Sequence, residues 1–149
     1  MNATDIEILG LLSKIELTVS KLYKVYAKKY PEYKQFWKDL VKEEEGHAEL
    51  IKTIGKYLKN GAISLNQKKC SKEAVETILM YVEDRLERAK TRTIPLSSAF
   101  NSALQIEKNI IEKDFCSFFD GDEPEFRKSC GLITQETNQH RNKIESMLS

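Results

Sequence analysis

The chain has 149 residues, a formal net charge of +1 from 24 Lys and Arg against 23 Asp and Glu, and 40% hydrophobic residues. This length and composition favour one soluble globular domain over residues 1–149 and exclude a collagen-like or disordered chain. With only 6 Gly and 3 Pro, the chain has too few turn residues for an all-β fold, so helices are favoured. The balanced charge offers no basic surface, so neither nucleic acid nor an anionic membrane is expected as a partner.

The first half of the sequence predicts an antiparallel pair of helices. Apolar residues recur at helical spacing over residues 4–29 and predict the first helix. Pro31 suits the first turn of a second helix over residues 31–59, which ends at the stop signal Asn60-Gly61. Because the connection is so short, the two helices must form a hairpin.

The second half predicts a long connection followed by a second hairpin. Residues 62–70 form a polar linker, and a shorter, highly charged helix follows over residues 71–91. After Pro95, a fourth helix is predicted over residues 96–119 and, beyond a Gly-containing break, a fifth over residues 123–148. Two helical hairpins joined by a long crossover with an additional short helix are typical of ferritin-like four-helix bundles, so we expect an all-α fold of this kind.

The cysteines and the amino-terminal segment indicate the cellular compartment. Cys70, Cys116 and Cys130 lie far apart and form no C-x-x-C pair. We interpret them as reduced structural thiols, with a redox-sensing thiol as the alternative. Residues 1–5 lack the basic start and apolar core of a signal peptide, and no run is apolar enough to cross a membrane. A cytoplasmic protein is therefore expected.

Acidic and imidazole side chains interrupt the apolar stripes of the four long helices. The interruptions are Glu16 in the first helix, Glu44 and His47 in the second, Glu107 in the fourth, and Glu136 or Thr137 followed by His140 in the fifth. Glu16 and Glu44 are each 14 residues from the turn near Tyr30, whereas Glu107 and Glu136 are 14 and 15 residues from Gly121. Antiparallel packing then places all four carboxylates at one level of the bundle.

Buried carboxylates that face one another repel unless they are protonated or neutralised by cations. A pair of divalent ions resolves this repulsion. Carboxylates suit iron or manganese, one histidine for each ion fills a further position, and Glu-x-x-His spacing places both ligands on one helix face. We therefore predict two divalent ions, either iron or manganese. Glu43, Glu45 and Glu49, in contrast, are interpreted as a solvated acidic patch.

At these residues the chain resembles the rubrerythrin branch of the ferritin-like superfamily over nearly its whole length. The matching elements are Glu16 with Tyr23 seven residues later, the Pro31-Glu32 turn, Glu44-Glu45-Gly46-His47, Ile106-Glu107, and the Glu/His pair of the last helix. The resemblance implies a di-iron site that reduces peroxide or dioxygen. It also implies Glu16, Glu44, His47, Glu107 and His140 as ligands, with Tyr23 beside the metals as the candidate catalytic residue.

The last helix departs from the family pattern. Rubrerythrins carry Glu-x-x-His there, whereas Glu136 lies four residues before His140, and the residue three before it is Thr137. Either Glu136 is a ligand through a shifted helix, which we favour because a spacing of four keeps one face, or that carboxylate is missing. A further family glutamate, three residues after Glu107, is replaced by Ile110.

These features predict a cytoplasmic metal-binding oxidoreductase that reduces peroxide or dioxygen. No rubredoxin domain is expected in these 149 residues, so a separate protein is expected to donate the electrons. A homodimer is also expected. Two alternatives stay open: a degenerate ferritin-like bundle that acts as an interaction or structural module, and a protein for iron oxidation and storage.

Overall fold

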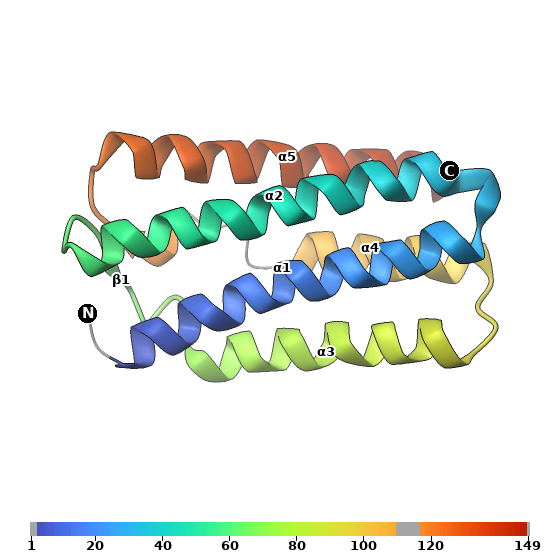
Figure 1. The fold of residues 1–149 in the computed structure, drawn as a ribbon, viewed down its shortest axis with the longest axis horizontal. Helices are drawn as coiled ribbons and strands as arrows, with labels where there is room; N and C mark the ends of the chain where they lie inside the picture. Colours follow the sequence, from blue (N-terminus) through green and yellow to red (C-terminus); the bar gives the residue numbers. More distant parts are fainter. Residues whose placement is uncertain (1–2, 110–116, 149) are drawn as a thin grey trace.

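A computed structural model of the chain describes residues 3–109 and 117–148, and these residues are mostly helical (Figure 1). Its elements, in chain order, are α1 (Ala3–Lys29), a 3-10 turn (Pro31–Tyr33), α2 (Lys34–Lys59), β1 (Ser64–Leu65), α3 (Lys72–Thr91), α4 (Leu96–Asn109), β2 (Phe119–Asp120) and α5 (Pro124–Leu148). This arrangement agrees with the all-α fold predicted from the sequence. In the described ranges, no helix combines the length and apolar character that a membrane crossing requires.

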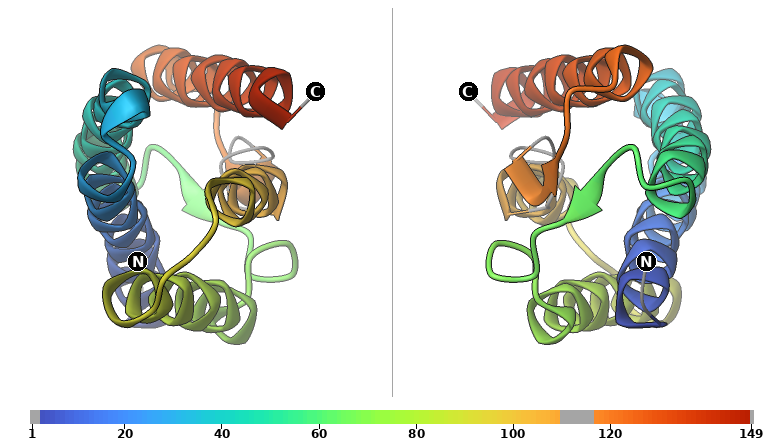
Figure 2. Two further views of the ribbon diagram at one scale, coloured as in Figure 1. Left: turned by 90° about the vertical axis from the view of Figure 1, so that its right-hand side faces the viewer. Right: turned by 90° about the vertical axis from the view of Figure 1, so that its left-hand side faces the viewer.

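The helices form two antiparallel pairs around a common interior. α1, α3 and α5 run in one direction, and α2 and α4 run in the other (Figure 1). α1 packs along both α2 and α3, while α4 packs along α5. In the views along the helices, α5 lies at the top and α3 at the bottom. α1 and α2 form one side, and α4 lies on the opposite side (Figure 2).

Most predicted helix ends agree with the structure, but the predicted helix over residues 96–119 is wrong at its end. Phe119 and Asp120 form β2, which pairs antiparallel with β1 in a segment that was predicted to be a polar linker. This pairing buries Phe119 and Ile63 in the core. Residues 110–116, which include Ile110 and Cys116, lie outside the described residues.

Gly121 allows the chain to reverse closely beside this short sheet. Its φ is +145°, and a Cβ atom at this position would lie 2.7 Å from the backbone oxygen of Ala62. Only glycine accepts this combination of backbone conformation and close approach without strain.

An aromatic cluster fills the interior near the turn that joins α1 to α2. Trp37 is fully buried and stacks on Phe100, with 5.2 Å between the ring centroids. The rings of Tyr26 and Tyr23 lie beside the same indole, with centroid distances of 4.8 Å and 5.5 Å.

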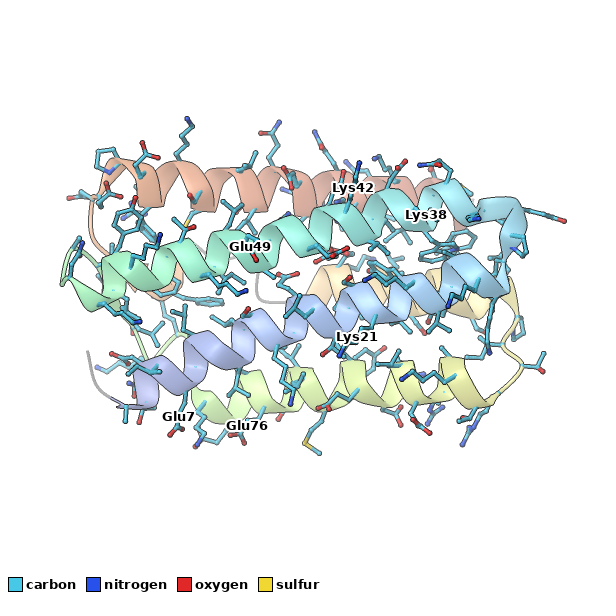
Figure 3. The ribbon with its side chains drawn as sticks, viewed as in Figure 1. Glu7, Lys21, Lys38, Lys42, Glu49 and Glu76 are labelled. Carbon is cyan, nitrogen blue, oxygen red and sulfur yellow. The ribbon has the colours of Figure 1, made fainter. Side chains whose placement is uncertain are left out.

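The charged side chains that Figure 3 labels on α1 and α2, such as Lys21, lie on the exposed faces of these helices. The polar interior described next is therefore separated from the solvated exterior.

Candidate metal centre

Five buried acidic and imidazole side chains meet between α1, α2, α4 and α5. They are Glu16 on α1, Glu44 and His47 on α2, Glu107 on α4 and His140 on α5, and each is no more than 1% exposed. Each occupies a position in the apolar stripe of its helix, so the periodicity that builds the core also directs these polar groups inward. We call Glu16, Glu44 and Glu107 the inner carboxylates.

The five side chains form two overlapping groups. In the first group, ligand atoms of Glu16, Glu44 and His47 lie within 4.8 Å of one another, and in the second those of Glu44, Glu107 and His140 do so. Glu44 belongs to both groups: its Oε2 is 3.6 Å from Nδ1 of His47, and its Oε1 is 3.3 Å from Nδ1 of His140. Glu44 therefore belongs to both groups of side chains that could hold a metal ion.

Each imidazole also contacts a carboxylate on its far side. Nε2 of His47 lies 2.8 Å from Oε2 of Glu136, and Nε2 of His140 contacts Oε2 of Glu43. We call Glu43 and Glu136 the outer carboxylates. Each outer carboxylate contacts the histidine of the other helix: Glu136 of α5 contacts His47 of α2, and Glu43 of α2 contacts His140 of α5. We call these the crossed contacts. A carboxylate only accepts hydrogen bonds, so Nε2 of His47 donates its proton to Glu136. The contact between Nε2 of His140 and Glu43 pairs an imidazole with a carboxylate in the same way.

This outward donation determines what faces the interior. Both Nδ1 atoms face the inner carboxylates. If a metal ion replaces the proton on Nδ1, the neutral imidazole keeps its proton on Nε2 and offers the Nδ1 lone pair to the ion. A carboxylate on the outer nitrogen fixes the ring and its tautomer in the manner common at metal-binding histidines.

Burial and mutual contact shift the pKa values of these groups. Burial alone would raise the pKa of Glu44, but contact with His140 and His47 lowers it to about 2. Burial would lower the pKa of both imidazoles, yet contact with Glu107 and Glu44 raises that of His140 to about 10, and contact with Glu44 raises that of His47. Burial, followed by the charge of Glu44, raises the pKa of Glu107 to about 7. Without a metal ion, the imidazoles thus serve as counter-ions to the inner carboxylates.

Several oxygen atoms of the inner carboxylates have no hydrogen-bond partner. These buried atoms are Oε2 of Glu16, both oxygens of Glu44 and Oε2 of Glu107. In the part of the chain that the structure describes, no Lys or Arg forms an ion pair with them. Buried carboxylate oxygens without partners are costly, and together with imidazole nitrogens they are a donor set that suits iron or manganese.

Tyr23, which the family resemblance implies as a neighbour of the metals, lies beside the inner carboxylates. Its side chain is fully buried, and its hydroxyl donates a hydrogen bond of 2.9 Å to Oε1 of Glu107. Burial, together with the charges of Glu107 and Glu44, raises the pKa of Tyr23 well above 10. The phenol therefore keeps its proton and presents it to the carboxylate.

The structure places two predicted positions differently from the favoured interpretation. α5 is a continuous helix, so no shift brings Glu136 among the inner carboxylates; its side chain is 28% exposed and lies on the outside of His47. Thr137 takes the fully buried face instead. Glu43, interpreted as part of a solvated patch, contacts His140. A signal for Glu43 was present in the sequence, because Glu43 precedes His47 by four residues, as Glu136 precedes His140.

Comparisons of the chain with models of protein families, with curated proteins and with solved structures found no match.

Proposed function

We propose that the chain is a rubrerythrin-like, ferritin-fold protein with a dinuclear metal centre, in which α1, α2, α4 and α5 form the bundle. The proposed ligands are Glu16, Glu44, His47, Glu107 and His140, and the proposed ions are two irons, with manganese as the alternative. The observation that carries the proposal is the position of Glu44, whose two oxygens face different imidazoles within two overlapping groups of ligand atoms.

Distances between the ligand atoms support metal binding over a closed network of ion pairs. Nδ1 of each imidazole lies between 3.3 and 3.9 Å from its inner carboxylates. Charge-assisted N–H···O bonds are shorter, about 2.7–2.9 Å. Two ligand atoms that share an ion at about 2.1 Å from each lie roughly 3 Å or more apart. The observed separations thus fit atoms that converge on a cation better than atoms that bond to each other.

The proposed reaction is the reduction of peroxide or dioxygen. Bound iron supplies the electrons, and a separate electron-donor protein restores them. The chain contributes a dry interior, since the inner carboxylates and both imidazoles are no more than 1% exposed. Tyr23 holds a proton at Oε1 of Glu107, and the outer carboxylates orient the imidazoles. Two electrons and two protons convert one peroxide molecule into two waters.

Metal analysis of anaerobically loaded protein tests the proposal. We expect about two iron or manganese ions per chain, with most of the metal lost in Glu44→Gln and in His47→Ala. Glu45→Gln is the matched control, because Glu45 is adjacent in sequence but its side chain is 50% exposed and lies 3.9 Å from Lys24; it should bind metal normally. A chain that binds no metal under these conditions would falsify the proposal.

A second candidate function is a non-catalytic interaction or structural module. It is favoured by Thr137, which occupies the buried position where a fourth inner carboxylate would complete the centre. If the chain is such a module, added iron should leave its melting temperature unchanged. If the centre is intact, bound iron should raise the melting temperature, because the metal binds only the folded chain. A role in iron storage needs the same ligands and a shell-like assembly, so a dimer by light scattering argues against storage.

A further inference from the structure

The two helical hairpins supply equivalent residues to the centre at all but one position. Glu16 on α1 corresponds to Glu107 on α4, and the segment Glu43-Glu44-x-x-His47 corresponds to Glu136-Thr137-x-x-His140. The outer carboxylates and the histidines are matched, including their crossed contacts. The exception is Thr137, which stands where the first hairpin has the bridging Glu44.

Thr137 has a buried hydroxyl without a hydrogen-bond partner. Four other helical threonines donate to the carbonyl four residues earlier: Thr18, Thr53, Thr77 and Thr91. Thr137 is 2% exposed, and its Oγ1 has no hydrogen-bond partner. A buried donor that does not use its local carbonyl is available to a ligand from outside the chain. Because it lies one turn before His140 on the same buried face, that ligand would lie at the centre.

Charge and ligand number indicate what kind of ligand is missing. The inner carboxylates and two imidazoles offer at most eight ligand atoms, whereas two octahedral ions take about twelve. Two divalent ions against three inner carboxylates leave a net charge of +1 among the groups that face each other directly. The missing side chain at position 137 is itself a carboxylate, so its substitute should be a small monoanion.

We propose that the centre binds, beside Thr137, a small external monoanion of the size of formate, which adds ligand atoms to the centre and accepts a hydrogen bond from Oγ1 of Thr137. This inference rests on the proposed function, because the anion is held by the two cations as well as by Thr137. The inference assigns Thr137 a binding role. A glutamate at this position would occupy the place of the anion with its own carboxylate, whereas the shorter threonine would leave that place to an external ligand.

Formate titration of Co(II)-loaded protein tests the inference without any measurement of turnover. Co(II) substitutes for iron, and its visible absorption responds to changes in coordination. We expect a saturable change with formate in the unaltered protein. Thr137→Glu should bind Co(II) at least as tightly and lose the formate response, since its own carboxylate takes the place of the anion.

Thr137→Val tests the contribution of the hydroxyl alone, because valine lacks the hydroxyl but occupies a similar volume. It keeps the shape of the side chain and should retain the metal while binding formate roughly tenfold more weakly, the value of one hydrogen bond to a charged group. Thr53→Val is the matched control, because Thr53 bonds to its local carbonyl on an exposed face of α2, and formate affinity should not change.

The outcomes distinguish the two proposals. If the unaltered protein binds no Co(II), the proposed metal centre is wrong and this inference fails with it. If Co(II) binds but formate has no effect, or if Thr137→Glu responds to formate as the unaltered protein does, the metal centre stands and the role of Thr137 is refuted.

Discussion

Replacing Glu107 with glutamine should stabilise the metal-free protein at neutral and alkaline pH. Glu107 is 1% exposed, and burial together with the charge of Glu44 raises its pKa from 4.5 to about 7. At about 1.36 kcal/mol per pH unit, this difference amounts to ~3 kcal/mol of unfavourable free energy once the carboxylate is ionised in the folded chain. Glutamine keeps the shape of the side chain and an oxygen that can accept the hydrogen bond from Tyr23.

The pH dependence has a definite sign. The folded chain binds the proton of Glu107 more tightly than the unfolded chain, so the unfavourable contribution is absent below about pH 4.5, grows as the pH rises, and is complete above about pH 7. The gain from Glu107→Gln should therefore vanish near pH 4.5 and reach about 1–3 kcal/mol at pH 8. For a chain of this length, that corresponds to a rise in melting temperature of at least about 2 °C.

Thermal unfolding in the presence of a chelator, at pH 5 and at pH 8, measures this effect. Glu45→Gln serves as the control, since its exposed side chain has no comparable burial, and its melting temperature should follow the unaltered protein at both pH values. Added metal should reverse the order, because the unaltered protein gains more from its ligand than Glu107→Gln does. A variant that melts at or below the unaltered protein at pH 8, with no pH dependence, refutes the view that Glu107 carries a desolvated charge.

Three further predictions concern the outer carboxylates, a glycine and a thiol. Glu136→Gln and Glu43→Gln should each weaken metal binding about 10- to 100-fold in competition with a chelator, and unchanged affinity would remove their orienting role. Gly121→Ala should destabilise the chain by about 2 kcal/mol in urea unfolding, given its φ of +145° and the 2.7 Å contact, whereas Gly131→Ala, in open space on α5, should be neutral or stabilising. Burial raises the pKa of Cys70 to about 11, so alkylation at pH 8 should be slow until the chain unfolds; rapid labelling of the folded protein would favour a redox-sensing thiol.

The helices could be predicted because their signals are local. Spacing of apolar residues, Pro31 at the start of a turn and Asn60-Gly61 at the end of α2 act within a few residues, and the structure confirms the end of α2 at Lys59 with Gly61 at a φ of +80°. The pairing of β1 with β2 could not be predicted in this way. It joins segments more than fifty residues apart, and neither two-residue strand has a pattern of its own.

The candidate centre was predictable to the extent that its residues lie in apolar stripes. Glu16, Glu44, His47, Glu107 and His140 interrupt those stripes, and the structure brings them together. Glu43 was missed because it lies in a run of three glutamates, in which a solvated face is the ordinary explanation. Its role depends on a contact with another helix, which the pattern within one helix does not contain.

The position of Glu136 shows how a spacing of one residue changes a role. In a regular helix, residue i−4 is rotated about 40° from residue i, whereas residue i−3 is rotated about 60° to the other side. On α5 the second direction faces the interior, so the buried position falls to Thr137 and the half-exposed edge to Glu136. From that edge a glutamate reaches the outer nitrogen of a histidine on the neighbouring helix, as Glu43 does in the other hairpin.

A threonine at the position equivalent to Glu44 affects the candidate centre differently from a missing histidine, because Glu44 belongs to both groups and each histidine belongs to one. A missing histidine would impair one cation position and leave the other intact. Each overlapping group here retains two inner carboxylates and one imidazole, so neither position is emptied by the threonine. Because Glu44 is shared between both groups, a glutamate at position 137 would be shared as well. In the proposed centre, threonine at this position would therefore leave a ligand position common to both cations unfilled. If the proposed ions are bound, an anion held beside Thr137 would lie where Glu16, Glu44, Glu107 and both imidazoles converge, and a small oxidant would have to reach the same place to be reduced.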